Sequence, residues 1–139
     1  MQKDDFFAPK LTEDEIRGLS SLALAHLGDA VYELMVRLFL CSSRGKTGGG
    51  LHHAAVALVN AHAQAEAAQR ILPLLTEEEM AVFRRGRNAK VNSVPKHAEI
   101  GDYHSATGLE ALFGWLYLLE RKERLNELFA VIMEGYHAA

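Results

Sequence analysis

Hydrophobic and polar positions alternate along the chain with helical spacing, and helix-start signals mark where some of the helices begin. Thr12 with Glu15, and Thr76 with Glu79, form capping boxes, in which two side chains satisfy free backbone N–H groups of the first turn. The pattern predicts helices over residues 12–40, 51–72, 103–119 and 123–136, and a short arginine-bearing helix that starts at Thr76. Because no strand-like alternation is present, we expect an all-α fold.

Two segments between these helices are predicted to be loops. Residues 42–50 end in three consecutive glycines, and residues 91–101 contain asparagine, serine and proline. Gly28 lies inside the first predicted helix, where it indicates either a kink or a close contact with another helix.

Length and composition favour one compact domain over all 139 residues, with a core of about residues 19–136. Apolar residues make up 49% of the chain, which argues against disorder. The single cysteine excludes an internal disulfide and suits a reducing cytoplasm. No signal peptide or apolar stretch of membrane-spanning length is apparent, so we expect a cytoplasmic protein without membrane contact.

The charge is unevenly distributed, although the net value is only −3. Residues 84–96 contain five basic side chains and no acidic one, whereas the rest of the chain has 10 basic and 18 acidic residues. Such a concentration indicates a local surface for anions. It contains no aromatic residue for stacking on unpaired bases, which favours a duplex backbone over a single strand. A solvated charged surface is the alternative. The RNA-binding candidates are Arg84, Arg85, Arg87, Asn88, Lys90 and Lys96.

Four polar residues share one face of the otherwise apolar first helix. His26, Asp29, Glu33 and Arg37 fall within roughly 80° of the helix circumference. Because the other faces are apolar, we expect a buried helix whose polar face lines a cleft or an internal network. The alternative is a ladder of ion pairs from Asp29 through Glu33 to Arg37.

A second acidic residue stands alone in a later apolar helix. Glu110 is the only charged residue between positions 106 and 119, and no cation lies one turn away. A buried carboxylate needs a partner, a metal ion or a proton. Asp29 and Glu110 together would form an oxygen-rich site for a hard divalent cation, Mg²⁺ first, with Mn²⁺ as a substitute. Pairing of Glu110 with Arg37 is the alternative.

The helix over residues 51–72 carries two further polar faces. His53, Asn60 and Gln64 share one of them, and His62, Glu66 and Arg70 share the other. Both are consistent with plain surface, and they carry no assignment from spacing alone.

Several motifs in the right order resemble the ribonuclease III family. They are Leu27-Gly28-Asp29-Ala30-Val31 with Glu33-Leu34, Leu58-Val59-Asn60 with Glu66, and Glu110-Ala111-Leu112 with Gly114 and Tyr117. Residues 84–90, Pro95-Lys96 and residues 103–118 resemble its Mini-III branch, which lacks the double-stranded-RNA-binding domain. The resemblance covers about residues 19–128.

The resemblance implies an all-helical homodimeric endoribonuclease that hydrolyses double-stranded RNA with Mg²⁺ and leaves 5′-phosphate ends. The implied substrate is the base-paired stalk flanking 23S ribosomal RNA, with a large-subunit ribosomal protein as a partner. By position, Asp29 and Glu110 match catalytic and metal-binding carboxylates, and Glu33, Glu66 and Thr107 are supporting candidates. We expect the dimer interface near His26, Val31, Leu34 and Leu38, because so apolar a helix is hard to cover in a monomer.

The chain departs from the broad family at three positions. Ala25 and Thr107 stand where the family has further acidic ligands, and the Mini-III branch shares both changes. His26 replaces an aromatic residue that packs across the dimer. The number of metal ions therefore stays open, and two other functions remain alternatives. One is a catalytically inactive ribosome- or RNA-binding module on the same fold. The other is an unrelated helical dimer with arginine-mediated protein contacts.

Overall fold

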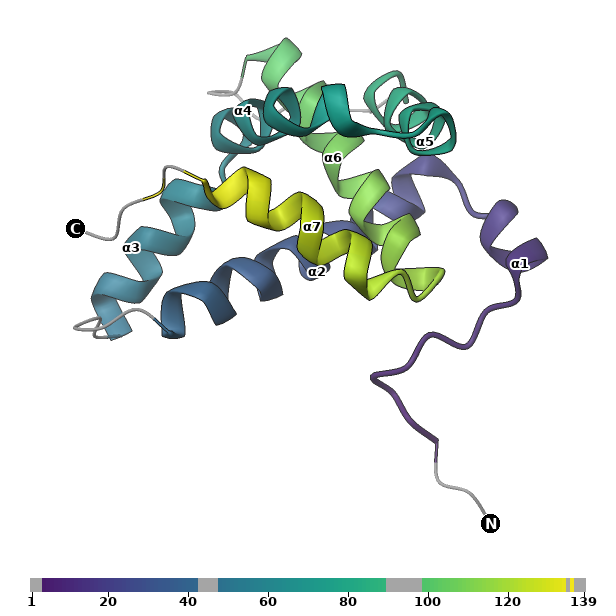
Figure 1. Cartoon of the computed structure of the whole chain (residues 1–139), viewed down its shortest axis with the longest axis horizontal. Coiled ribbons are helices and arrows are strands. Elements are labelled where there is room, and N and C mark those ends of the chain that lie inside the picture. The colour runs from purple at the N-terminus through teal and green to yellow at the C-terminus, as the bar shows by residue number, and fades with distance from the viewer. Residues whose placement is uncertain (1–3, 43–47, 90–98, 135, 137–139) are drawn as a thin grey trace.

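The computed structural model describes residues 4–42, 48–89, 99–134 and 136, and this part of the chain is helical without strands. The elements are α1 Glu13–Arg17, α2 Ser21–Cys41, α3 Gly48–Val59, α4 Ala61–Ile71, the short 3₁₀ helix η1 Leu72–Leu74, α5 Glu77–Arg87, α6 Ile100–Leu118 and α7 Lys122–Met133 (Figure 1). The all-α prediction is confirmed. None of the described helices combines the length and the apolarity that a membrane crossing requires.

The first predicted helix is two helices, and its prediction as one element was wrong. The backbone N–H of Gly18 closes α1 by bonding to the carbonyl groups of Asp14 and Glu15. Ser20 then starts α2, because its side chain accepts a hydrogen bond from the N–H of Ala23 at 3.0 Å. A second capping signal within the apolar run therefore separates the elements.

The alanine-rich helix predicted over residues 51–72 is also divided, at Asn60. The Asn60 Oδ1 accepts from the Ala63 N–H at 2.8 Å and starts α4. Its Nδ2 donates to the Val56 carbonyl at 3.2 Å and so closes α3. One side chain caps both helices, which a continuous apolar pattern does not reveal. α3 also begins at Gly48, so the three glycines predicted to be loop are helical.

Helix α6 lies at the centre of the molecule and contacts α2 on one side and α5 on another (Figure 1). Its contact with α2 is made by glycines. A Cβ atom at Gly28 would overlap the carbonyl oxygen of Glu110, and one at Gly114 would overlap that of Leu24. A Cβ at Gly86 of α5 would come within 2.7 Å of Ala111 Cβ. Gly28 therefore marks a close helix contact.

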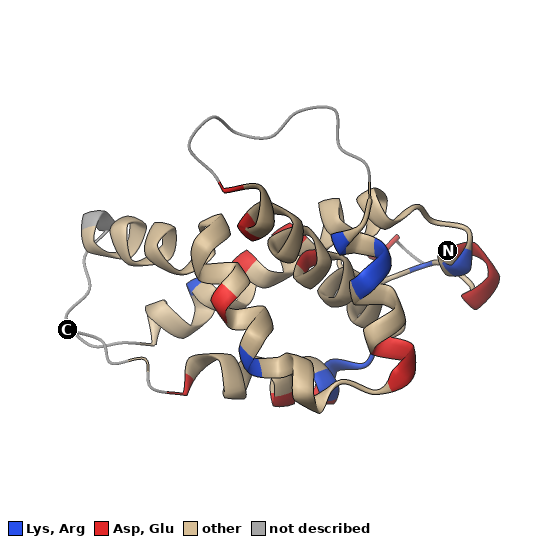
Figure 2. Cartoon of the chain, turned by 90° about the horizontal axis from the view of Figure 1, so that it is seen from above, with Lys and Arg blue, Asp and Glu red and all other residues tan. Residues whose placement is uncertain are grey.

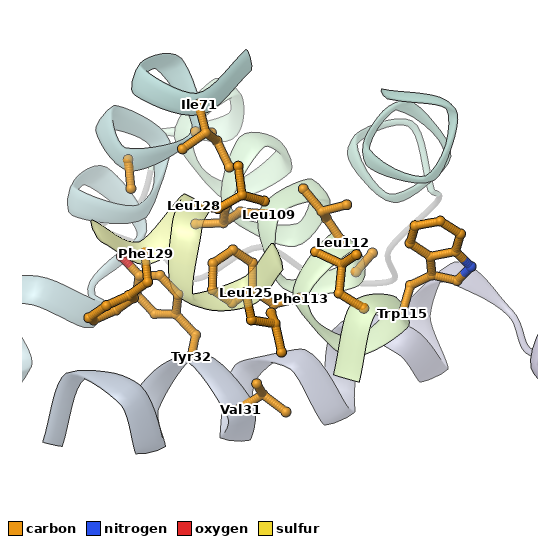
Figure 3. Close-up of a cluster of buried hydrophobic side chains, with 14 of the residues drawn as sticks. Val31, Tyr32, Ile71, Leu109, Leu112, Phe113, Trp115, Leu125, Leu128 and Phe129 are labelled. Atoms are coloured by element: carbon orange, nitrogen blue, oxygen red, sulfur yellow. The ribbon is translucent and has the colours of Figure 1, made fainter. Parts of the chain in front are cut away.

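The core fills the space between α2, α4, α6 and α7 (Figure 3). Tyr32 of α2 is 1% exposed and packs edge-on against Phe113 and Phe129, with ring centroids 5.2 and 5.9 Å away. Edge-to-face contacts of this kind add to the free energy gained from burying aromatic area. α7 thus closes the core over the α2–α6 pair.

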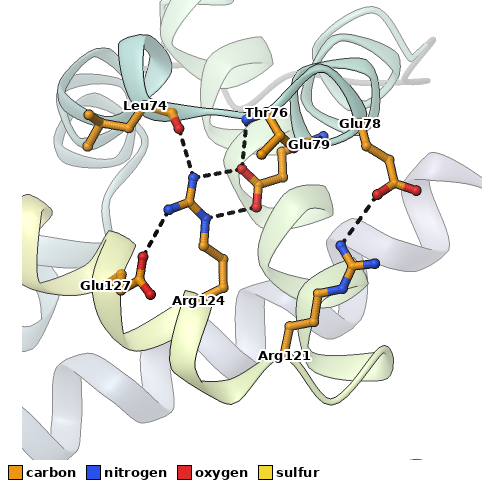
Figure 4. Close-up of polar contacts among 7 residues, drawn as sticks. All are labelled: Leu74, Thr76, Glu78, Glu79, Arg121, Arg124 and Glu127. Atoms are coloured by element: carbon orange, nitrogen blue, oxygen red, sulfur yellow. Dashed lines mark hydrogen bonds and ion pairs between the residues drawn. The ribbon is translucent and has the colours of Figure 1, made fainter.

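A buried ion pair joins α7 to the start of α5 (Figure 4). Glu79 is 3% exposed, and Arg124 donates to its two carboxylate oxygens at 2.9 Å each. Burial raises the pKa of Glu79, but hydrogen bonds from Arg124 and Thr76 outweigh it and hold the pKa below its usual value. Arg124 also donates to the Leu74 carbonyl at 2.8 Å, so it fixes the entry to α5.

The glycine contact between α2 and α6 makes a testable prediction. Gly28→Ala should lower the free energy of unfolding in urea by about 2 kcal/mol or more, because the methyl group forces the two backbones apart. Gly101→Ala is the matched control, since a Cβ there meets no atom within 4 Å. It should leave stability unchanged or raise it by up to about 1 kcal/mol through helix propensity. Equal stability of the two variants would contradict the packing argument.

Candidate active site

The two carboxylates singled out in the sequence lie together at the α2–α6 crossing. Asp29 follows Gly28 directly in α2. A Cβ atom at position 28 would overlap the backbone carbonyl oxygen of Glu110 in α6, so the two acidic residues lie on either side of this close contact. The Asp29 and Glu110 side chains lie within hydrogen-bonding reach of each other. The close backbone contact therefore sets the separation of the two acidic groups. Their catalytic and metal-binding roles stay predictions.

The surroundings of Glu110 oppose its ionisation. Burial raises the pKa of Glu110 to about 8, and the charge of Asp29 and a hydrogen bond with it act in the same direction. Only a hydrogen bond from Gln64 acts the other way. Without a cation, the pair therefore retains a proton around neutral pH.

Gln64 of α4 is a site residue that sequence reasoning missed. Its side chain is 2% exposed and belongs to the interior, so the interpretation of its helix face as plain surface was wrong there. Nε2 donates to the Val59 carbonyl at 2.8 Å, and the same amide contacts Glu110. A signal was available in its neighbours: Ala63 and Ala65 flank Gln64, and small residues let helices approach closely.

The other charged residues of the α2 polar face form a simple local pair. Arg37 donates to Glu33 at 2.8 Å, and both side chains are at least one-third exposed. The described ion pairs do not include Asp29, so the ladder from Asp29 through Glu33 to Arg37 is not formed. They also include no contact between Arg37 and Glu110. The alternative of an Arg37–Glu110 pair was therefore wrong. Asp29 itself is exposed, as is His26, so the α2 polar face opens to solvent.

The two other supporting candidates already have partners. Glu66 pairs with His62 at 3.0 Å, and His62 also contacts Asp102 at 2.9 Å. The hydrogen bond and the charge of Asp102 are the main causes that raise the pKa of His62. The Thr107 hydroxyl is buried and donates to the Tyr103 carbonyl at 2.9 Å. Glu66 is thus held in place on α4, and Thr107 on α6, the helix that carries Glu110.

The basic segment begins at the C-terminal end of α5. Figure 2 shows α5 acidic at its start and basic at its end, which suits the helix dipole. Arg84, Arg85 and Asn88 are exposed, and they line a hollow of about 540 Å³ together with residues 20–22 at the start of α2. Arg87 is partly exposed. Lys90 and Lys96 lie outside the described residues.

The donor set at the crossing suits a hard divalent cation, on which enzymes of the ribonuclease III family generally depend. It offers the carboxylates of Asp29 and Glu110 and the amide of Gln64, whose Oε1 is buried and has no partner in the described part of the chain. These oxygens match the preference of Mg²⁺. No cluster of three or more His, Cys, Asp or Glu occurs in the described residues, so water and substrate would complete the coordination.

The chain is similar to known proteins over most of its length. The model of the ribonuclease III domain family matches residues 22–121. A Mini-ribonuclease 3 from Clostridium tetani is 39% identical over 132 residues, which are 94% of this chain and 87% of the relative. One from a Thermoanaerobacter species is 44% identical, covering 89% of this chain and 87% of the relative. A crystal structure of a protein from Fusobacterium nucleatum superposes with a TM-score of 0.79 at 33% identity, covering 86% and 96% of the two chains.

The paired carboxylates predict a pH-dependent stability. The pKa of Glu110 is about 8 in the folded protein and 4.5 as its ordinary value, so between these pH values the folded state binds more protons than the unfolded state. The free energy of unfolding should therefore fall as the pH rises through this window. In chelator, wild type should lose stability between about pH 5 and pH 8.5 relative to Glu110→Gln, which cannot titrate at this position. Urea denaturation of both proteins at each pH measures the difference in their free energies of unfolding. The titration of His62 does not affect this difference, because both proteins contain His62. A constant difference would contradict the coupling.

Proposed function

The chain belongs to the ribonuclease III family and is an endoribonuclease for double-stranded RNA, and we propose that it works with Mg²⁺ to mature the ends of 23S ribosomal RNA precursor. The observation that carries the metal chemistry is the pairing of Asp29 and Glu110 at the α2–α6 crossing. Two carboxylates in contact, one of them partly buried and without an arginine or lysine partner among the described residues, form the kind of site that a divalent cation neutralises.

The two carboxylates hold the cation, and the fold prevents them from separating. When bound, Mg²⁺ supplies positive charge for the phosphate and lowers the pKa of water, which hydrolysis at neutral pH requires. Asp29 presents its oxygens on the exposed face of α2, where a phosphodiester can approach. Glu110 binds the cation from the protein side, and the Gln64 amide contacts Glu110. Cleavage leaves a 5′-phosphate and a 3′-hydroxyl group.

Glu33, Glu66 and Thr107 support this site without binding the cation. The Glu33–Arg37 pair lies one turn beyond Asp29 on the same helix face, where RNA would pass. Glu66 is held by His62, and Thr107 lies one turn before Glu110. Their existing bonds give each of them a fixed position beside the reacting groups.

The end of α5 and the segment after it bind the RNA backbone. Arg84, Arg85 and Asn88 are exposed beside the start of α2, and Leu22 in the same hollow lies two turns before Asp29 on one face of that helix. Arginine forks match phosphate oxygens, and such contacts position a duplex without reading its sequence. Arg87, Lys90 and Lys96 complete the proposed surface.

We propose the ribosomal RNA substrate because the sequence motifs resemble those of the Mini-III branch, and no pocket among the described residues selects it. A base-paired stalk beside 23S ribosomal RNA is a duplex with irregular ends, and a shape-reading surface suits it. We place this activity in the cytoplasm, in one catalytic domain, with a large-subunit ribosomal protein presenting the RNA.

The enzyme acts as a homodimer through the exposed apolar face of α2. Leu34 and Leu38 are 52% and 59% exposed, and they line an apolar groove of about 720 Å³ with Val31. Phe7 of the N-terminal segment forms one wall and is itself 86% exposed. A groove beside protruding apolar side chains is self-complementary, as a two-fold interface requires. His26 is exposed but lies outside the lining of this groove.

The catalytic proposal is tested with purified protein and a long RNA duplex in Mg²⁺ and in chelator. Wild type should cut only with Mg²⁺, and Asp29→Asn and Glu110→Gln should each lose about 100-fold or more in rate, because each removes a cation ligand and keeps its shape. Asp14→Asn is the control: its carboxylate pairs with Arg17 on α1 and should not matter. Cutting in chelator, or near-normal turnover of either site variant, would exclude the proposed site.

The dimer proposal is tested by Leu38→Glu, with Leu74→Glu as the control. Leu74 is 48% exposed and lies outside the groove, so only the first variant places a charge in the interface. Sedimentation should show Leu38→Glu as a monomer and Leu74→Glu as a dimer. A mixed dimer of one wild-type and one Asp29→Asn protomer should nick a single strand, because each site attacks one strand. Paired cuts by that mixed dimer, or full activity of a monomer, would contradict the arrangement.

A further inference from the structure

The amide of Gln64 is held in one orientation by two acceptors. Its Nε2 donates to the Val59 carbonyl at 2.8 Å, and the amide also interacts with the Glu110 carboxyl group and lowers its pKa, as a donor does. An amide nitrogen carries two hydrogens, so one remains for Glu110 when the other is given to Val59. A flipped amide would direct its carbonyl oxygen at two other acceptors. Oε1 is therefore the atom left over, on the same carbon as Nε2 and roughly 2 Å from it.

The leftover oxygen is buried and has no hydrogen-bond donor among the described residues. An unsatisfied buried carbonyl is unfavourable, so a native protein rarely keeps one without a reason. Thr107, one turn before Glu110, cannot supply the missing donor, because its hydroxyl hydrogen is already given to the Tyr103 carbonyl. The contact with Val59 explains why an amide is present in the interior. It does not explain an unpaired oxygen beside the carboxylates.

We propose that Gln64 is a positioning residue of the cation site, with Nε2 orienting the Glu110 carboxylate and Oε1 completing the hydrogen bonds of the bound cation's hydration shell. This inference rests on the proposed function, because it assumes that Asp29 and Glu110 bind the cation. An amide oxygen accepts hydrogen bonds from water molecules on the cation, whereas the two carboxylates bind it directly. Residues around the direct ligands of a metal commonly change its affinity 10- to 100-fold.

The assignment gives Gln64 two separable tasks. The bond to Val59 joins α3 to α4 and contributes to stability, whereas the contact with Glu110 and the free oxygen contribute to cation affinity. A purely structural glutamine would affect only the first property. Measurement of Mg²⁺ binding in the absence of RNA therefore distinguishes the two roles without relying on cleavage.

The test compares Gln64→Met, which keeps the length of the side chain and removes its polar atoms, with Gln69→Met on the exposed face of the same helix. Mg²⁺ alone is titrated into each protein by calorimetry, and the midpoint of thermal unfolding is recorded in chelator and in Mg²⁺. Gln64→Met should raise the dissociation constant for Mg²⁺ about tenfold or more, and Gln69→Met should leave it unchanged. A folded Gln64→Met protein with wild-type affinity would overturn the proposal.

A second variant, Gln64→Glu, covers the case in which methionine prevents folding. It adds a third carboxylate beside Asp29 and Glu110, so Mg²⁺ should raise its unfolding midpoint by more than that of wild type. An increase equal to or smaller than that of wild type would overturn the proposal. Failure of the proposed function looks different: wild type would not bind Mg²⁺, or Asp29→Asn would bind it equally well.

Discussion

The contact of the α2 and α6 backbones at Gly28 and Gly114 is the constraint on which the rest of the structure depends. Neither position has room for a Cβ, so the helix axes lie as close as their main chains permit. The residue after Gly28 and the residue whose carbonyl touches it are the two carboxylates of the candidate site. A separate glycine contact, between Gly86 and Gly108, brings α5 and its arginines against another side of α6. Packing thus sets the distances that binding and hydrolysis require.

Two acids of the same chain, the buried Glu79 and the partly buried Glu110, differ in their partners. Glu79 is almost fully buried, yet Arg124 and the Thr76 backbone donate to it and its pKa stays below the usual value. Glu110 has an acid and an amide for neighbours, and its pKa rises to about 8. Burial disfavours charge at both positions, so the partner decides the outcome. The helix packing that holds Asp29 against Glu110 therefore stores an electrostatic strain that a divalent cation would relieve, which is the physical basis of the proposed metal dependence.

The sequence predicted the helical class, the Thr76–Glu79 capping box and the pairing of Asp29 with Glu110, because each depends on local pattern or on a lone charge in an apolar helix. It did not predict the breaks after Gly18 and at Asn60, where the capping side chains of Ser20 and Asn60 interrupt continuous apolar runs. Gln64 was missed for a related reason: a glutamine on an alanine-rich helix looks solvated until a second helix covers it. Such burial follows from three-dimensional packing, and spacing along one helix carries no information about it.

Helix α2 joins the two proposed properties of the enzyme in one rigid element. Gly28 faces the core, Asp29 faces solvent beside Glu110, and Ala30 and Leu34 face the apolar groove. If a second copy occupies that groove, no loop intervenes between the dimer interface and the carboxylate on either protomer. The separation of the two Asp29 side chains is then set by helix geometry and by the two-fold axis alone. A double-strand cut needs two sites at a fixed spacing. Because α2 carries both the interface and the Asp29 carboxylate, it sets that spacing without any other structural element.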